Sequence, residues 1–354
     1  MKPKPVHTNL GLKNRRDLRF ELLRIVSACF ILFNHINISL VPNNTLTPIQ
    51  FFNYYMVRFF HLGGKFGVNI FVILGCFFLC TGSFKIQRVY RLILEVVFYG
   101  FILNLVDIIL FSQKLTIPDF IHGFSYWFPF AYILMLLFIP LINKLLNKGY
   151  GKILCILGAF FFSFVFIWGI FMPDRIFKLI TLEQVIGSIW FCYLYVLTAQ
   201  LKSKGFFDDK RVIRIAGFLV FPLYLLMFML VIITGKSIFR DMYSPLCFLS
   251  ALCMFLLFQN INENKLLRIG QPICRISSAT LGMYLVQCHN NTFQIWNKTV
   301  FSYDKWSDSI MLLPICILSV CVLILVSLLI NALFKPVINR FSSLKLTDRR
   351  RHIS

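Results

Sequence analysis

Residues 20–41 read FELLRIVSACFILFNHINISLV. A helix of about 20 mostly apolar residues crosses the hydrocarbon core of a bilayer, and this stretch is long and apolar enough to do so. It also contains Glu21, Arg24 and His35, which are costly inside a membrane. The stretch therefore predicts a membrane-spanning helix that carries functional groups.

The same apolar character extends along the whole chain. Of its 354 residues, 58% are hydrophobic and 14% are charged, and the mean hydropathy is +0.77. Soluble domains are about 45–50% apolar even when Gly is counted, and about 25% charged. The composition excludes a disordered chain, a disulfide scaffold and a soluble multi-domain enzyme.

The chain is also strongly basic, with 36 Lys and Arg against 14 Asp and Glu and a net charge of +22. In a soluble protein this excess would indicate nucleic-acid binding. Here the basic residues lie between apolar runs, so we attribute them to orientation in a membrane. We predict contact with membrane lipids and none with nucleic acid.

Ten apolar runs are long enough to predict transmembrane helices. They cover residues 20–41, 67–84, 89–111, 127–146, 152–172, 182–201, 212–234, 240–259, 275–296 and 309–333. The predicted fold class is an all-α polytopic membrane protein of about ten transmembrane helices. The predicted domains are a cytoplasmic basic tail at 1–19, a transmembrane domain at 20–333 and a cytoplasmic basic tail at 334–354.

Lys and Arg are concentrated in the tails and in every second loop, which predicts that both ends are cytoplasmic. The longest loop, at about 42–66, is then on the outer side. The first run is too long for the apolar part of a cleaved signal peptide and lacks a small-residue cleavage site.

Most of the 11 Cys residues lie inside apolar runs, and no pair has CxxC spacing. This pattern is typical of buried Cys acting as small apolar residues, so we predict neither a metal site nor a disulfide. The chain has no P-loop, GxSxG, HExxH or Rossmann fingerprint. No bound cofactor is predicted.

Arg24 and His35 are eleven residues apart, which places them on one helix face because each residue turns a helix by about 100°. Glu21 lies one turn before Arg24 and can form an ion pair with it. The unperturbed pKa of His is about 6.5, so a neutral His35 could act as a general base. The alternatives are a His35 bonded only to neighbouring helices and an Arg24 that snorkels to the interface.

Arg88 and Arg91 lie three residues apart at the inner end of the third run and therefore face the same way, with Glu95 one turn further. Arg binds phosphate well through its planar fork, so this pair could hold a phosphorylated cytosolic donor. The alternative is that both residues only follow the positive-inside rule.

Three further residues are predicted to support the site, namely Asn69, Trp127 and Tyr284. Asn69 begins the second run, and Tyr284 lies in the ninth. Trp127 has the alternative role of an aromatic anchor at the membrane surface. Weaker candidates are Asp107, Glu183 and His289.

Five segments in order resemble the integral-membrane acyltransferases of the acyltransferase 3 type. They are Arg24 with His35, the stretch GVNIFVILGC at 67–76, Arg88 with Arg91, Trp127-Phe128 with Tyr132 and Pro140, and Ser278 with LGMYL at 281–285. Leu74 and Cys76 depart from a Ser and an aromatic residue, and Gln287 stands where a His often follows. These departures bear on the substrate class more than on the fold.

The resemblance implies acyl transfer from cytosolic acyl-CoA, most often acetyl-CoA, to a hydroxyl of a cell-surface or lipid-linked glycan. It implies His35 and Arg24 as catalytic residues, Arg88 and Arg91 as the acyl-CoA site, and a bacterial cytoplasmic membrane as the location. Acyl-CoA is then a donor substrate and not a resident cofactor.

Two other function classes stay open. A transporter or flippase of a lipid-linked sugar or small metabolite would also have many helices with buried charges, although the two halves of the chain show no internal symmetry. In a membrane scaffold, the buried charges would form structural ion pairs and would tolerate conservative change.

Overall fold

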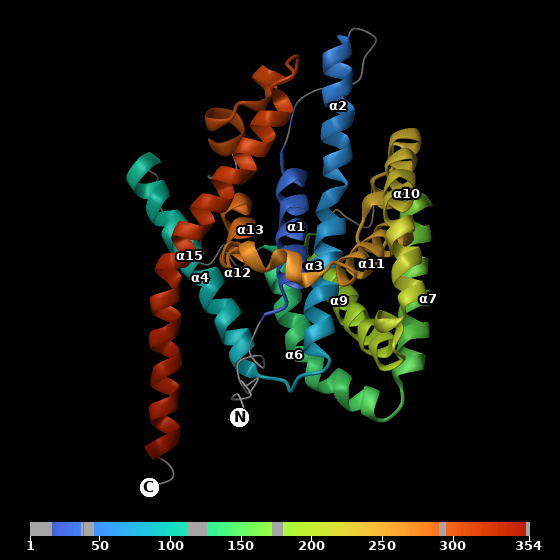
Figure 1. Ribbon diagram of the computed structural model, residues 1–354, viewed down its shortest axis with the longest axis vertical. Helices are drawn as coiled ribbons and strands as arrows, with labels where there is room; N and C mark the ends of the chain where they lie inside the picture. The colour runs from blue at the N-terminus through green and yellow to red at the C-terminus, as the bar shows by residue number, and fades with distance from the viewer. Residues whose placement is uncertain are drawn as a thin grey trace, which may run out of the picture.

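The structure is a computed structural model of the chain. It describes residues 16–36, 38, 46–111, 126–171, 180–289 and 295–351, without the side chains of 110–111, 180–183 and 338–351. Within these residues it is helical and has no strand (Figure 1). The main helices are α1 (Leu18–Asn34), α2 (Pro48–His61), α3 (Gly63–Leu79), α4 (Ile86–Phe111), α6 (Trp127–Asn147), α7 (Gly151–Phe171), α9 (Ile180–Ser203), α10 (Lys210–Thr234), α11 (Pro245–Gln259), α12 (Gly270–Ser277), α13 (Thr280–Cys288) and α15 (Leu312–Arg351).

Among the described residues, eight helical segments are long and apolar enough to cross a membrane. They correspond to eight of the ten predicted runs. The first and ninth runs are the exceptions, because they form α1, which has 17 residues, and the short pair α12 and α13. The all-α membrane fold is confirmed, whereas the count of ten and the orientation stay predictions.

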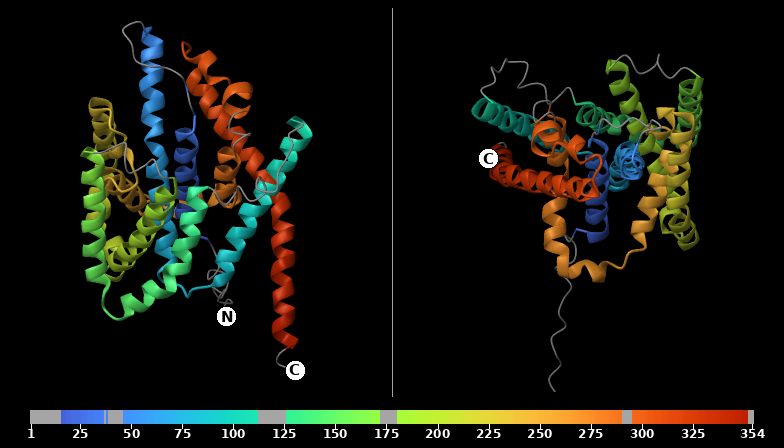
Figure 2. Two further views of the ribbon diagram at one scale, coloured as in Figure 1. Left: turned by 180° about the vertical axis from the view of Figure 1, so that it is seen from behind. Right: turned by 90° about the horizontal axis from the view of Figure 1, so that it is seen from above.

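The short helix α1 lies inside the molecule, where it contacts α2, α3, α11, α12, α13 and α15. Seen from above, it is placed between α15 and α3 (Figure 2). Leu23 and Leu32 are almost completely buried. Because other helices surround α1, its polar residues face protein and not lipid, which is where ionisable groups in membrane proteins are found.

The predicted outer loop at 42–66 is wrong for most of its length, because residues 48–61 form α2. Thr47 caps α2 through a capping box with Gln50, and Pro48 occupies the first turn. After Leu62 the chain continues into α3, so that Pro48–Leu79 forms one long span beside α1. The polar and aromatic residues of this segment suggested a loop, but local capping at Thr47 sets the start of a helix.

The predicted ninth span is also wrong as a single helix. Residues 270–277 and 280–288 form α12 and α13, which are separated at Ser278 and Ala279. Non-helical backbone at membrane depth is tolerated where protein surrounds it, and Ala279 is fully buried. Gly282 lets α13 lie against the Tyr99 hydroxyl of α4, where any Cβ would clash.

Small residues bring α3 close to α1. A Cβ on Gly67 would lie 2.5 Å from the backbone oxygen of Ser27, and a Cβ on Gly64 would clash with the Asn34 side chain. Close helix contact through Gly is typical of membrane bundles, since burial of apolar surface provides little drive there. This packing fixes the face of α1 that carries Arg24 and His35.

The last helix, α15, continues to Arg351, so the predicted tail at 334–354 is helical over most of its length. Figure 1 shows α15 crossing α4 and descending to the lower end of the molecule.

Candidate active site

The first turn of α1 carries the predicted ion pair. Arg24 Nη1 lies 2.9 Å from Glu21 Oε2, and the Ser277 hydroxyl donates to the same carboxylate oxygen. Arg16 is 3.9 Å from Glu21. The Glu21–Arg24 pair is therefore confirmed, and it joins α1 to the end of α12.

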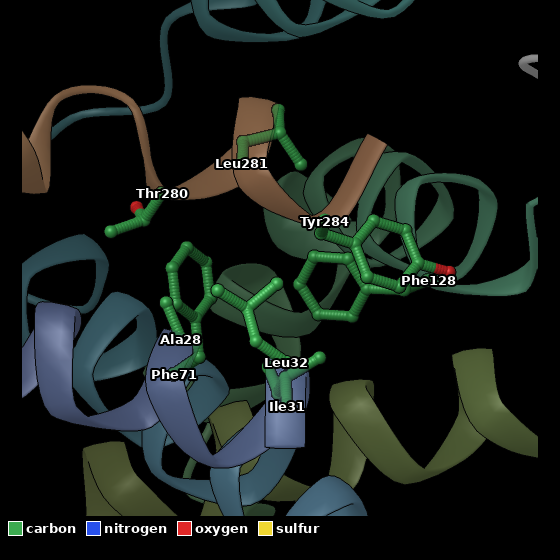
Figure 3. Close-up of a pocket in the computed structure, with 8 residues that line it drawn as sticks. All are labelled: Ala28, Ile31, Leu32, Phe71, Phe128, Thr280, Leu281 and Tyr284. Carbon is green, nitrogen blue, oxygen red and sulfur yellow. The ribbon is translucent and has the colours of Figure 1, made fainter. Parts of the chain in front are cut away.

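Between Arg24 and His35, the face of α1 is apolar. Ala28, Ile31 and Leu32 line a pocket of about 10 Å³ together with Phe71, Phe128, Thr280, Leu281 and Tyr284. Figure 3 shows the side chains of α1 opposite those of α13 across this pocket. We call it the apolar passage, and in the structure it has room for about one water molecule.

Beyond the apolar passage lies a larger space of about 330 Å³, which we call the His35 cavity. Ile31 and Tyr284 line both spaces, so the two are adjacent. The polar side chains around the cavity are Asn34, His35, His61, Lys65, Ser237, Arg240 and Asp241. The structure brings three predicted site residues together here, since Trp127 and Tyr284 line the same cavity as His35.

Gln287 fixes the orientation of His35. Gln287 Nε2 donates to the Leu32 carbonyl at 2.9 Å, so its Oε1, 2.9 Å from His35 Nδ1, must accept a hydrogen bond. Nδ1 must then carry the proton, because an amide oxygen cannot donate. In the neutral imidazole Nε2 is therefore the nitrogen with the free lone pair.

Trp127 lies at the start of α6, and the ammonium of Lys65 is 3.9 Å from its ring centroid. This is a cation–π contact. It holds the Lys65 charge against one wall of the His35 cavity, within electrostatic range of His35. Trp127 thus lines the same cavity as His35, and its role in the site stays a prediction.

Tyr284 joins α13 to α6. Its ring centroid is 5.5 Å from that of Phe128 on α6 and 6.5 Å from that of His35 on α1. Because Tyr284 lines both the apolar passage and the His35 cavity, it forms part of the wall between them.

Arg88 and Arg91 are exposed at the start of α4 and line neither space. Arg88 and Arg24 both lie within electrostatic range of the Tyr132 hydroxyl, so the two predicted cationic groups share one end of the bundle. Glu95 lies one turn from Arg91 and interacts with its charge. Glu95 also lines neither space.

Asn69 has a structural position. Its side-chain amide donates to the Met242 carbonyl at 2.8 Å and accepts from the Trp190 indole at 2.8 Å. It is fully buried and lines neither the passage nor the cavity. Asn69 therefore ties α3 to α9 and to the segment before α11.

A second buried polar cluster lies where α13 ends. His289 Nε2 is 3.0 Å from Asn104 Oδ1, and His289 Nδ1 is 3.5 Å from Asp107 Oδ2. These contacts attach the end of α13 to α4. The side chain of Glu183 lies outside the described residues.

Sequence reasoning missed Gln287 as the partner of His35, and it missed His61, Lys65, Arg240 and Asp241 as cavity residues. Gln287 was noted only as a departure from a pattern. The four others lie at helix ends or in the segment interpreted as a loop, where charges are common and carry no signal.

The acyltransferase 3 family (Acyl_transf_3, acyltransferase domain) matches residues 17–332. The chain belongs to this family. Comparisons with curated proteins and with solved structures found no match.

This acyltransferase is a multi-pass membrane protein, as its apolar helices indicate. The matched region contains α1, both spaces and the Arg88–Arg91 pair, so the site described above lies within the acyltransferase domain. The family assigns acyl transfer in general, and the geometry of the His35 cavity bears on how this chain performs it.

Proposed function

We propose that the acyltransferase moves an acyl group, most often acetyl, from cytosolic acyl-CoA to a hydroxyl of a cell-surface or lipid-linked glycan. The proposal joins the family membership to one observation: His35 lines a cavity of about 330 Å³ and is held with Nε2 as its basic nitrogen. A bacterial cytoplasmic membrane with both termini in the cytoplasm is part of this proposal.

The chemistry follows from the position of His35. The acceptor hydroxyl binds in the His35 cavity, and its proton passes to His35 Nε2 as its oxygen attacks the thioester carbonyl. The new C–O bond forms and the C–S bond breaks. CoA leaves as the thiol after taking the proton back from the imidazolium, so His35 ends the cycle neutral.

The donor approaches from the Arg24 end. Arg88 and Arg91 hold the CoA phosphates there, because both side chains are exposed and the planar fork of Arg matches the oxygens of a phosphate. Arg24 lies one helical turn before Ala28, which lines the apolar passage, and it forms an ion pair with Glu21. The passage admits about one water molecule, so the acyl-pantetheine arm must displace Phe71, Phe128 or Tyr284 to reach His35.

The experiment uses inside-out membrane vesicles that contain equal amounts of wild type, His35→Ala or Cys29→Ala. Cys29 lies on α1 between Arg24 and His35 but lines neither space, so it is a matched control. Acetyl-CoA labelled in the acetyl group is added, and the label is followed into lipid-linked glycan and polymer.

We expect transfer by wild type and Cys29→Ala, and a loss of at least about 100-fold in His35→Ala, since general-base catalysis contributes about 10²–10⁴-fold. Transfer by a stably folded His35→Ala would contradict the role of His35. Absence of transfer from both acetyl-CoA and succinyl-CoA, with the native acceptor present, would favour a transporter or flippase.

A further inference from the structure

The charges around the His35 cavity are unbalanced. Lys65 and Arg240 are cationic and Asp241 is the one acidic side chain among the described residues that line it. A third cation, Arg58, lies close behind, within electrostatic range of both Arg240 and His61. Helices α1, α6 and α13 add no Lys, Arg, Asp or Glu to this lining, and their polar or aromatic contributions are Asn34, His35, Trp127 and Tyr284. The described part of the cavity lining therefore carries an excess of positive charge.

Arg240 differs from the other cations of the described chain that have fixed partners. Arg24 pairs with Glu21, Arg19 pairs with Asp17, and Lys202 donates to the Phe77 carbonyl. Within the described residues, the Arg240 guanidinium has no hydrogen bond and no ion pair as close as 4.0 Å, although Asp241 is its neighbour in sequence. A guanidinium carries five N–H donors, and the Arg240 side chain lines the cavity.

Placing two arginines close together is unfavourable unless a negative charge compensates them, and a partly buried cation costs free energy when it is unpaired. Arg240 and Arg58 repel each other beside a cavity large enough for a sugar-sized ligand. A planar guanidinium fork matches the two oxygens of a carboxylate or phosphate. An anionic ligand would compensate the repulsion between Arg240 and Arg58, and its two oxygens would pair with the guanidinium fork of Arg240.

We propose that the Arg240 side of the His35 cavity binds a carboxylate or phosphate group of the substrate. The proposal rests on the proposed function, since it places this anion on the substrate whose hydroxyl or acyl group reacts at His35. Two sources carry the same chemistry: an acid group on the acceptor sugar, and the far carboxylate of a dicarboxylic acyl donor such as succinyl-CoA. The CoA phosphates are at the other end, near Arg88.

Binding can be tested without turnover. The full chain in nanodiscs is titrated with octyl glucuronide and octyl glucoside, which differ in one carboxylate, and separately with succinyl-CoA and acetyl-CoA. Thermal unfolding reports the apparent Kd. The variants are Arg240→Gln, Arg240→Lys and, as the matched control, Arg268→Gln, because Arg268 is exposed on the 3₁₀ segment Glu263–Ile269, next to the start of α1.

We expect the anionic member of one pair to bind at least about tenfold more tightly than the neutral member in wild type and Arg268→Gln. Arg240→Gln should abolish that preference, and Arg240→Lys should keep part of it, because the charge is kept and the fork is lost. A preference within the glycoside pair assigns the anion to the acceptor, and one within the acyl-CoA pair assigns it to the donor.

Equal binding within both pairs in wild type, or a preference that survives in Arg240→Gln, would overturn the proposal. Arg240→Lys keeps the test valid if Arg240→Gln does not fold. Since no step requires catalysis, an absent anion site is distinguishable from an absent acyltransferase activity, which the labelled acetyl-CoA experiment measures.

Discussion

At the scale of single residues, the site depends on how His35 is held. Two hydrogen bonds of Gln287 decide which ring nitrogen of His35 is basic, because the amide nitrogen is used by the Leu32 carbonyl and only the amide oxygen is left for the ring. The same logic applies to other enzymes in which a fixed acceptor orients a catalytic imidazole. Gln287 is a positioning residue under this interpretation.

The first prediction is that Gln287→Leu lowers kcat by about 10- to 100-fold with little change in KM for the donor, because His35 loses its fixed tautomer. Gln287→Glu should restore part of the rate and move the acid limb of the rate–pH profile to higher pH, because a carboxylate stabilises the imidazolium. Initial rates across pH measure both effects. Gln271→Leu, an exposed change on α12, is the control. An unchanged pH profile in Gln287→Glu would argue against contact with His35.

The second prediction concerns the start of α1. Asp17 is its N-cap, accepting from the Arg19 backbone and paired with the Arg19 guanidinium at 2.6 Å. Burial raises the pKa of Asp17, but the hydrogen bonds and charge of Arg19 outweigh it, so the pKa lies below its usual value. A lowered pKa stabilises the fold above the usual pKa of about 4, and this is lost as the pH falls through the folded pKa.

Asp17→Ala should therefore cost about 1 kcal/mol at pH 7, and the difference from wild type should shrink below about pH 4. Thermal unfolding in nanodiscs at several pH values measures it. Asp208→Ala, at an exposed position in the 3₁₀ turn Phe206–Asp208, should have little effect. A difference that persists unchanged at low pH would show that the charge of Asp17 is not involved.

At the scale of helices, the contact between α1 and α3 is the tightest constraint on the site. The third prediction is that Gly67→Ala destabilises the protein by about 1–3 kcal/mol, because the new methyl group meets the backbone oxygen of Ser27 at 2.5 Å and backbone cannot rotate away. Gly217→Ala is the matched control, since its nearest neighbour is a Leu257 methyl at 3.4 Å. Equal unfolding midpoints for the two variants would refute the close approach.

The helices also show where sequence periodicity fails. Eight of the predicted runs form candidate spans, because a stretch of about 20 apolar residues in lipid must satisfy its backbone hydrogen bonds within a helix. The two that did not, α1 and the pair α12 and α13, carry His35, Tyr284 and Gln287. These helices are enclosed by others, so lipid does not set their length, and hydropathy alone overestimates them.

At the scale of the whole molecule, the two ends of the site differ in character. Arg24, Arg88 and Tyr132 lie at one end, and the His35 cavity with its polar lining lies at the other. Every charged residue that lines the cavity comes from a segment that the Lys and Arg distribution assigns to the outer side or its edge. The proposed transfer, from a cytosolic donor to an acceptor on the outer side, requires the two ends of the site to differ in this way.

The fourth prediction is that both termini are cytoplasmic. A fluorescent protein fused after Ser354 should fluoresce in a bacterial host, and alkaline phosphatase fused there should be inactive, because each reporter folds on one side of the membrane only. Fusions after Gly235, between α10 and α11, should give the reverse. The prediction would be contradicted if the same reporter were active at both positions, because that would mean an even number of crossings, or none, between Gly235 and Ser354.

The sequence by itself determined the class of fold, the positions of most spans, the family, and the placement of Arg24 and His35 on one face of α1. The fold class, the spans and the shared face depend on local properties, namely hydropathy and the helical period, whereas the family follows from the resemblance of five segments in order. Tertiary packing decided the rest. Gln287 contacts His35 across 252 residues, and the cavity collects Lys65, Trp127 and Arg240 from three separate parts of the chain. Such contacts depend on which helices meet and how closely, which no local pattern encodes.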